Sequence, residues 1–300
     1  MGVRRIIRAV IDDVRIPCHG EQLAAYVYRP DTPGDAPCVV MAHGFTGTRD
    51  DGLPGYAEAF RNAGFVVVLF DYRHFGASTG EPRQLLDIAR QLDDYRAVIQ
   101  WARGLDGVDP DRIVAWGTSY AGGHVLTIGA ADARLAAVIS QAPYTDSIPT
   151  LMCVEPRNIG RLMVEAVRDQ LGAWLGRPPR LVTALDAPGT FAVMTSPGSA
   201  STFAAVASPA WRNEFAARLI LTFVFYRPGR KAKHLKMPLL MCVCDKDHTT
   251  PAPPSVKFAA RAPHAELRHY PYDHFDIYSD PQVKADQVAF LQRTVLGVSA

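Results

Sequence analysis

Ser119 is the residue of this sequence best placed to act as a nucleophile. It lies within the motif Gly-Thr-Ser-Tyr-Ala-Gly (residues 117–122), between a strand-like run and a helix-like run. A side chain at such a strand–turn–helix corner projects clear of the sheet, and the backbone N–H that follows it faces the reacting carbonyl. Ala121 differs by one methyl group from the glycine that usually completes this motif. A serine that only caps a helix is the alternative interpretation.

A base and an acid for this serine are predicted near the end of the chain. His274 is the one histidine of nine that follows the last predicted strand, and Asp247 lies three residues past the end of the strand before it. A neutral hydroxyl is a poor nucleophile, and a histidine that a buried carboxylate holds in the correct tautomer can accept its proton. Asp245 and Asp146, which also follow predicted strands, are the alternative acids.

A glycine-containing loop, His-Gly-Phe-Thr-Gly (residues 43–47), directly follows a predicted strand. Glycines allow backbone N–H groups to approach a ligand closely, as the oxyanion site of an acyl-transfer reaction requires. The alternative is a tight turn with a buried, hydrogen-bonded His43. His74 lies in the loop after the next strand, without an acid spaced to orient it, and we interpret it as structural.

The predicted elements that position these loops alternate between strand and helix. Such alternation is typical of βαβ units, whose right-handed crossovers place the strands in one mainly parallel sheet. Two N-terminal segments, 6–16 and 23–28, predict an antiparallel hairpin at the edge of that sheet. The predicted strands are 38–42, 65–70, 112–116, 135–140, 238–244 and 265–270, and the predicted helices are 53–63, 85–103, 121–128, 255–262 and 283–296.

The alternation stops between residues 147 and 236, where predicted helices 161–175 and 211–225 are separated by stretches rich in proline and glycine. Because this stretch lies between two sheet strands, we expect a helical cap inserted into a core domain (1–146 and 237–300). A helical flap that forms a homodimer is the alternative. The apolar residues of this stretch are expected mainly to form its own small core, and otherwise an apolar pocket: Leu162, Met163, Trp174, Leu175, Phe191, Met194 and Phe203.

The composition excludes several classes of protein. The chain has 300 residues, of which 48% are hydrophobic, and its 32 basic and 30 acidic residues form no run of like charge. Neither nucleic acid nor an anionic membrane is therefore an expected partner. The N-terminus lacks an apolar signal core, and no apolar run is long enough to cross a membrane, so we expect a cytoplasmic protein. We expect no metal or cofactor, and we interpret the five cysteines, which lack zinc or disulfide spacing, as reduced thiols: Cys18, Cys38, Cys153, Cys242 and Cys244.

The motif at 117–122, the loop at 43–47 and the order Ser, Asp, His together resemble the serine α/β-hydrolases. Within them the chain is similar to capped esterases and to Xaa-Pro-peptidase-like or dienelactone-hydrolase-like proteins, over about residues 10–145 and 237–298. The resemblance implies a triad of Ser119, His274 and Asp247, with the N–H groups of Phe45 and Tyr120 as oxyanion donors. A serine at position 119 argues against dienelactone hydrolases, which use cysteine, and against dehalogenases and epoxide hydrolases, which use aspartate.

This resemblance implies hydrolysis of a carboxylic ester, or of a similar small acyl compound, through an acyl-enzyme. A peptidase, a thioesterase or an acyltransferase would use the same three residues. A non-catalytic ligand-binding protein of this fold, with a vestigial triad, is the remaining alternative.

Overall fold

The computed structural model describes residues 11–31 and 34–298 and contains an eight-stranded sheet. All neighbours from β4 to β11 run parallel, and the two N-terminal strands are antiparallel additions at one edge. The α/β class and the mainly parallel sheet are therefore confirmed. In spatial order the strands are β1 (Ile11–Cys18), β2 (Glu21–Tyr28), β4 (Val66–Phe70), β3 (Ala36–Ala42), β5 (Val108–Thr118), β6 (Ala137–Gln141), β10 (Leu239–Cys244) and β11 (Ala265–Tyr270).

The burial of each strand follows its place in the sheet. Every residue of β3, β4, β6 and β10 is buried, as expected for parallel strands that helices cover on both faces. In contrast, β1 alternates between exposed and less exposed positions because it lies at the edge. The predicted N-terminal hairpin is confirmed from residue 11 onward, and its first residues, 6–10, lie outside the described part of the chain.

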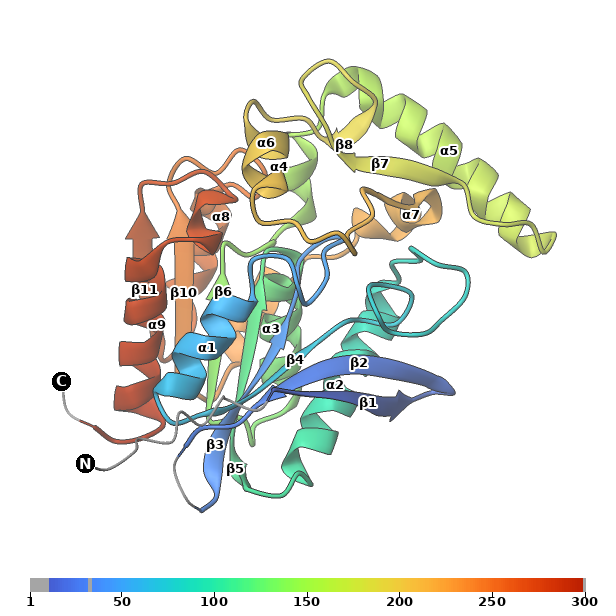
Figure 1. The fold of residues 1–300 in the computed structure, drawn as a ribbon. Helices are drawn as coiled ribbons and strands as arrows, with labels where there is room; N and C mark the ends of the chain where they lie inside the picture. Colours follow the sequence, from blue (N-terminus) through green and yellow to red (C-terminus); the bar gives the residue numbers. More distant parts are fainter. Residues whose placement is uncertain (1–10, 32–33, 299–300) are drawn as a thin grey trace, which may run out of the picture.

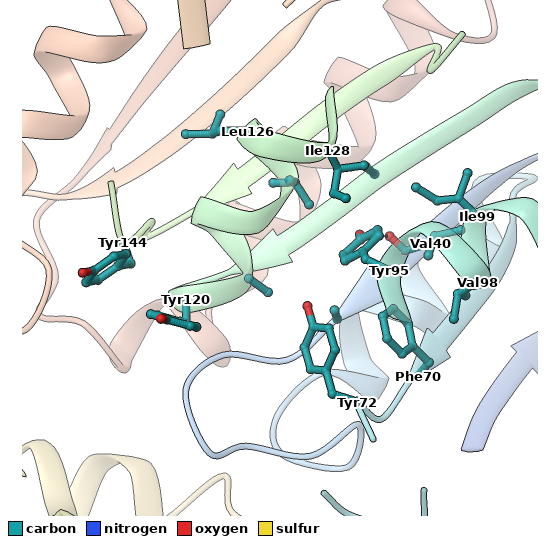
Figure 2. Close-up of a cluster of buried hydrophobic side chains, with 14 of the residues drawn as sticks. Val40, Phe70, Tyr72, Tyr95, Val98, Ile99, Tyr120, Leu126, Ile128 and Tyr144 are labelled. Atoms are coloured by element: carbon teal, nitrogen blue, oxygen red, sulfur yellow. Dashed lines mark hydrogen bonds between the residues drawn. The ribbon is translucent and has the colours of Figure 1, made fainter. Parts of the chain in front are cut away.

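Two helical layers cover the sheet. Tyr95 of α2 (Ile88–Arg103) and Leu126 of α3 (Tyr120–Ala131) belong to the apolar cluster on one face, together with α8 (Ala252–Ala259). Figure 2 shows α2 and α3 presenting their apolar side chains to the strands. Phe60 of α1 (Pro54–Asn62) and Phe290 of α9 (Pro281–Thr294) belong to the cluster on the opposite face.

Between β6 and β10 lies a stretch of chain that we call the 147–236 segment. Residues 147–223 lie in the upper part of Figure 1, whereas residues 228–234 pack against α3 and α8 of the core. The short strands of the segment form a sheet in the order β8-β7-β9. The elements are α4 (Ser147–Leu151), α5 (Pro156–Trp174), β7 (Leu181–Leu185), β8 (Ala192–Met194), α6 (Ser199–Ala204), β9 (Glu214–Ala216), η1 (Ala217–Leu219), α7 (Ile220–Phe223) and η2 (Pro228–His234).

The 147–236 segment contains helices, as expected, and, in addition, a three-stranded sheet that was not predicted. The predicted helix 161–175 is found within α5, but only Ile220–Phe223 of the predicted helix 211–225 is α-helical. Residues 214–216 instead pair with β7, and the Ala216 N–H donates to the Gln84 carbonyl of the core (2.9 Å). Phe215 and Ala216 are fully buried by this pairing, so tertiary contacts override the local helix propensity.

Two buried polar side chains of the core hold the 147–236 segment in place. Asp51 accepts hydrogen bonds from the backbone N–H of Ser208 (2.6 Å) and from that of Thr48 (2.7 Å) in its own loop. Gln84 Nε2 donates to the Glu214 carbonyl (2.8 Å). The loops that follow β3 and β4 therefore fix the position of the segment next to β9.

Within the described residues, neither the cysteines nor the helices indicate a metal site or a membrane-spanning segment. All five cysteines are free, and four of them are buried. No group of histidine, cysteine or acidic side chains in residues 11–31 and 34–298 has a geometry that could hold a metal ion. No helix in those same ranges combines the length and apolar content needed to span a bilayer.

Candidate active site

Ser119 occupies a strained backbone position between β5 and α3. Its φ of 55° and ψ of −116° lie in a region that residues with a side chain rarely adopt, and such strain is common at functional sites. Two hydrogen bonds to neighbouring loops hold this conformation: the Ser119 N–H donates to the Gln141 carbonyl (2.8 Å), and the Tyr144 N–H donates to the Ser119 carbonyl (2.9 Å). Ser119 therefore has the position that its sequence motif predicts.

The small residues around Ser119 allow the strand and the helix to close on each other. A Cβ at Gly117 would lie 2.2 Å from the Ala121 carbonyl oxygen, and one at Gly123 would lie 2.3 Å from the Tyr144 carbonyl oxygen. The methyl group of Ala121 is buried without disturbing this corner. The required glycines are thus those at 117 and 123, and the departure from the usual motif at 121 is structurally neutral.

We expect Gly117→Ala to lower the free energy of unfolding by at least about 3 kcal/mol, because the new methyl group would overlap the backbone of α3. Urea unfolding followed by circular dichroism measures the effect. Gly160→Ala in α5 is the matched control, since its Cβ meets nothing within 4 Å and alanine favours helix. Equal unfolding midpoints for the two variants would contradict the close contact at position 117.

His274 lies between Ser119 and Asp247 and is hydrogen-bonded to both. Its Nε2 is 2.9 Å from Ser119 Oγ, and its Nδ1 is 2.6 Å from Asp247 Oδ2. The side chains of His274 and Asp247 are almost completely buried. With the Nδ1 proton donated to the carboxylate, Nε2 is left as an acceptor for the Ser119 hydroxyl. The structure therefore brings together the three predicted side chains in an order suited to proton transfer.

The Asp247 carboxylate is fixed by the loop that follows it. Oδ1 accepts the backbone N–H groups of Thr249 (2.8 Å) and Thr250 (2.6 Å), and Oδ2 lies 2.9 Å from Thr250 Oγ1. Thr250 Oγ1 is also 3.1 Å from the Ala142 carbonyl. Thr250 was not among the predicted site residues, although an aspartate with threonines two and three residues further on is a typical signal for such a side chain–backbone turn.

The two alternative acids have other partners. Asp245 Oδ1 lies 2.7 Å from His269 Nδ1, and both side chains are about half exposed. Asp146 forms an ion pair with Arg227 (2.6 Å). Among the hydrogen bonds of the described residues, neither carboxylate contacts His274. Of the three candidate acids, Asp247 is therefore the one that lies beside the imidazole, where Thr250 Oγ1 is also 3.1 Å from His274 Nδ1.

His43 is a buried part of the loop after β3. Its ring lies 2.9 Å from the Gly44 carbonyl through Nδ1, and its Nε2 is 3.4 Å from the Tyr72 backbone nitrogen. Burial lowers the pKa of His43 to about 4, against a smaller opposing effect of the Gly44 carbonyl. At neutral pH the ring is therefore uncharged and stiffens the loop. His43 is therefore the buried, hydrogen-bonded residue of a tight turn, which is the alternative interpretation of this loop. Its side chain does not occupy the Phe45 N–H, which can still bind a ligand.

The backbone N–H groups of Phe45 and Tyr120 are available beside Ser119. A Cβ built on Gly44 would lie 2.9 Å from Ser119 Cβ, so the loop after β3 passes directly against the serine. Neither N–H has a protein acceptor among the described residues, and Tyr120 is the first residue of α3, where no intrahelical acceptor exists. Both groups can therefore donate to a ligand oxygen.

His74 has its own local contacts in the loop after β4. Its backbone N–H donates to the Thr79 carbonyl (2.9 Å), and its Nε2 lies 3.3 Å from Arg90 Nη1. Burial lowers the pKa of His74. These contacts agree with the structural role that we inferred for it.

A narrow cleft lined mainly by apolar side chains leads to Ser119. Phe45 and Phe275 from the core line it on one side. The 147–236 segment contributes Leu185, Met194, Phe203 and Trp211. Met194 and Phe203 are among the apolar residues predicted for a pocket, whereas Leu185 and Trp211 are not, since nothing in their local sequence distinguishes them.

The remaining apolar residues named in the segment do not line the cleft. Leu162 is buried within the segment. The Phe191 ring packs under the guanidinium of Arg161, whose Cζ lies 4.0 Å from the centroid of that ring. Met163, Trp174 and Leu175 are exposed on the surface of α5 or directly after it. The expectation of a small internal core therefore applies to only part of the set.

The sequence is similar to one protein family model and to several known proteins. The model of the X-Pro dipeptidyl-peptidase (S15) family matches residues 19–155. The quorum-quenching protein AidA of Acinetobacter baumannii (strain MDR-ZJ06) is 43% identical over 288 residues, which cover 94% of this chain and 95% of AidA. The acyltransferase drtE of Aspergillus calidoustus is 28% identical over 281 residues, which cover 87% of this chain and 88% of drtE.

The fold is also that of a solved hydrolase. The crystal structure of the α/β hydrolase GrgF from Penicillium sp. sh18 matches with a TM-score of 0.83 at 22% identity, over 96% of this chain and 99% of GrgF. Since AidA is 43% identical over almost its whole length, this chain belongs to the same family as AidA, and its fold is that of the α/β hydrolase GrgF.

Proposed function

We propose that this protein is a serine hydrolase that cleaves a carboxylic ester through an acyl-enzyme. Ser119 is the nucleophile, His274 the general base and Asp247 the acid that orients it. The observation that carries the proposal is the unbroken set of hydrogen bonds from Ser119 Oγ through His274 (2.9 Å) to Asp247 (2.6 Å). Its place at the end of an apolar cleft supports an organic acyl substrate.

In the first half of the reaction, Ser119 Oγ attacks the ester carbonyl carbon while its proton passes to His274 Nε2. The carbonyl oxygen becomes negative and accepts hydrogen bonds from the N–H groups of Phe45 and Tyr120. When the carbon–oxygen bond to the alcohol breaks, the imidazolium returns the proton to the leaving oxygen. The products are a free alcohol and an ester of Ser119.

In the second half, a water molecule attacks the acyl group while His274 Nε2 takes one of its protons. The bond to Ser119 Oγ then breaks, and the proton moves to this oxygen, which restores the serine and releases a carboxylic acid. Asp247 remains ionised throughout and keeps the imidazole in one tautomer. Each backbone donor of the oxyanion site is expected to contribute about 3 to 4 kcal/mol to the lowering of the barrier.

We propose further that the 147–236 segment is a cap over the core domain formed by residues 1–146 and 237–300. Four of its side chains, Leu185, Met194, Phe203 and Trp211, line the cleft that contains Ser119. Because these side chains are apolar, the acyl or alcohol part of the substrate that they contact is expected to be apolar as well.

Two other reactions share this machinery. The family model that matches residues 19–155 describes X-Pro dipeptidyl-peptidases, which supports peptide bonds as an alternative substrate. The relative named as an acyltransferase supports an alcohol or thiol in place of water as the acceptor of the acyl group. The name of AidA makes a bacterial quorum signal with an acyl bond a candidate for the natural substrate.

Labelling with a fluorophosphonate, followed by an ester series, tests the proposal. We expect the probe to modify Ser119, as peptide mass spectrometry would show, and p-nitrophenyl esters from acetate to dodecanoate to be hydrolysed faster than a prolyl peptide anilide or an acyl-coenzyme A thioester. A folded protein that neither reacts with the probe nor cleaves any of these compounds would refute the hydrolase function. Faster cleavage of the anilide or the thioester would instead reassign the bond that is broken.

A further inference from the structure

A surface groove lies between the short helix η2 and helix α8. It consists of two adjoining hollows, which share Arg230, Phe258 and Arg261 in their walls. Their volumes are about 420 and 350 Å³, which is the size of sites for small molecules. We call the two hollows together the η2–α8 groove.

Close packing of the two helices forms the floor of this groove. A Cβ on Gly229 would lie 2.3 Å from Phe258 Cδ2, so η2 reaches the Phe258 ring only because position 229 has no side chain. Pro149, Pro253 and Pro254 line the groove beside the first turn of α8, about one turn before Lys257. The groove therefore has an apolar end, and its more basic part lies further along α8.

Four exposed basic side chains, which we call the groove cations, line this further part. Arg230 and Lys233 are three residues apart on η2, a 3-10 helix in which side chains at this spacing lie above one another. Lys257 on α8 and Arg261 in the turn that follows are four residues apart, or about one helical turn. Each of the two helices thus presents a pair of cations to the same groove.

The negative charge that would balance these cations is missing from the surrounding chain. Neither of the segments that form the two walls, 215–244 and 248–265, contains an aspartate or a glutamate. Among the described residues, Asp146 is the only carboxylate that lines the groove, and it already forms an ion pair with Arg227 (2.6 Å). None of the groove cations has a carboxylate of the described chain within 4.0 Å. Although the chain as a whole is nearly neutral, folding concentrates positive charge here.

This unbalanced charge favours a bound anion. Like charges three or four residues apart on a helix repel each other, and here the repulsion is repeated on two neighbouring helices. An anion between the helices would contact cations of both and remove this repulsion. Guanidinium groups such as those of Arg230 and Arg261 bind phosphate oxygens through two parallel N–H groups, so phosphate is the anion that fits them best.

We propose that the η2–α8 groove binds a small organic phosphate. Its phosphate groups contact the groove cations, and its organic part lies against Pro149, Pro253 and Pro254. Four cations exceed the charge of a single carboxylate, which favours a ligand with two or more negative charges. The volume of the groove favours a small molecule over a macromolecule. This inference does not depend on the proposed hydrolase function.

Isothermal titration calorimetry with inorganic pyrophosphate tests the charged part of the site. In about 20 mM salt, where screening is weak, we expect the wild-type protein to bind it with a Kd below about 1 mM. The double variant Arg230→Ala with Arg261→Ala should bind at least about tenfold more weakly, because both guanidinium groups are lost. Since both side chains are exposed and without ion pairs in the described chain, the variant should keep the wild-type unfolding temperature.

The matched control is the double variant Arg96→Ala with Arg168→Ala, which removes the same charge from the surface elsewhere. The Arg96 side chain is 49% exposed and that of Arg168 is 62% exposed, and neither lines the groove. We expect this control to bind pyrophosphate like the wild type. A wild-type protein that binds no pyrophosphate, or equal affinities of the groove variant and the control, would overturn the proposal.

A second titration tests the organic part of the ligand. Phenyl phosphate should bind at least about threefold more tightly than inorganic phosphate, because its ring can contact the three prolines. Sulfate should bind more weakly than pyrophosphate. Equal binding of phenyl phosphate and inorganic phosphate would contradict the apolar end of the site. Sulfate that binds as tightly as pyrophosphate would show that the groove only accumulates anions.

The phosphate could also belong to a lipid headgroup, and flotation with phosphatidylglycerol vesicles separates the two sources. We expect the protein to bind the free phosphates and to remain unbound in the presence of vesicles. Vesicle binding by a wild-type protein that does not bind free pyrophosphate, lost in the variant Arg230→Ala with Arg261→Ala, would assign the groove to a membrane surface and overturn our proposal.

Discussion

Replacement of Ser119 by alanine is expected to reduce kcat/KM for a p-nitrophenyl ester by at least about 10⁴-fold, because no other group could then form the acyl-enzyme. Alanine keeps a Cβ at the same backbone angles and removes only the Oγ that lies 2.9 Å from His274. The fold should therefore persist, with an unchanged circular dichroism spectrum. Initial rates with the purified variant measure the loss.

A matched control for this variant is Ser255→Ala. The Ser255 side chain is buried, like that of Ser119, but its Oγ lies 3.1 Å from Thr145 Oγ1, and it does not line the cleft. We expect this variant to keep the wild-type rate. If Ser119→Ala retained more than a few percent of the activity, another nucleophile would have to be sought.

The second large effect is expected for Asp247→Asn, which should lower kcat by about 10⁴-fold. An amide nitrogen facing His274 Nδ1 would favour the opposite tautomer, in which Nε2 carries the proton and cannot accept that of Ser119. The amide oxygen can still accept the N–H groups of Thr249 and Thr250, so the loop should stay in place. Steady-state kinetics combined with thermal unfolding separates lost catalysis from lost stability.

Asp245→Asn provides the comparison, since Asp245 is two residues away and is bound to His269 on the surface. Its activity should equal that of the wild type. If Asp245→Asn were more impaired than Asp247→Asn, the orienting role that we propose for Asp247 would belong to Asp245 instead.

The central sheet, and the order of Ser119, Asp247 and His274 along the chain, could be predicted because the sequence patterns that indicate them are local. Strands such as β3 and β10 are continuous apolar runs that helices cover on both faces, and each is followed by a polar loop. Ser119 was identified by the small residues around it, which the close contacts at Gly117 and Gly123 explain. The carboxyl ends of parallel strands meet at one edge, so the loops that follow them share a site.

What could not be predicted depends on contacts between distant parts of the chain. Residues 214–216 appeared helical because nothing nearby shows that they pair with β7 and with the Gln84 carbonyl. For the same reason Leu185 and Trp211 were not recognised as cleft residues. The exposure of Met163, Trp174 and Leu175 was not predicted either, since the periodicity of an amphipathic helix does not tell which face packs against the rest of the protein.

The proposed reacting groups and the lining of the cleft come from different parts of the fold. The side chains that we propose to move protons, those of Ser119, Asp247 and His274, follow strands of the large sheet, whereas the cleft residues of the 147–236 segment are Leu185, Met194, Phe203 and Trp211. Selection can therefore exchange these four side chains, and with them the range of substrates accepted, without altering the reacting groups. Sequence variation among relatives should accumulate first at positions 185, 194, 203 and 211, and a change of substrate should require fewer mutations than a change of reaction.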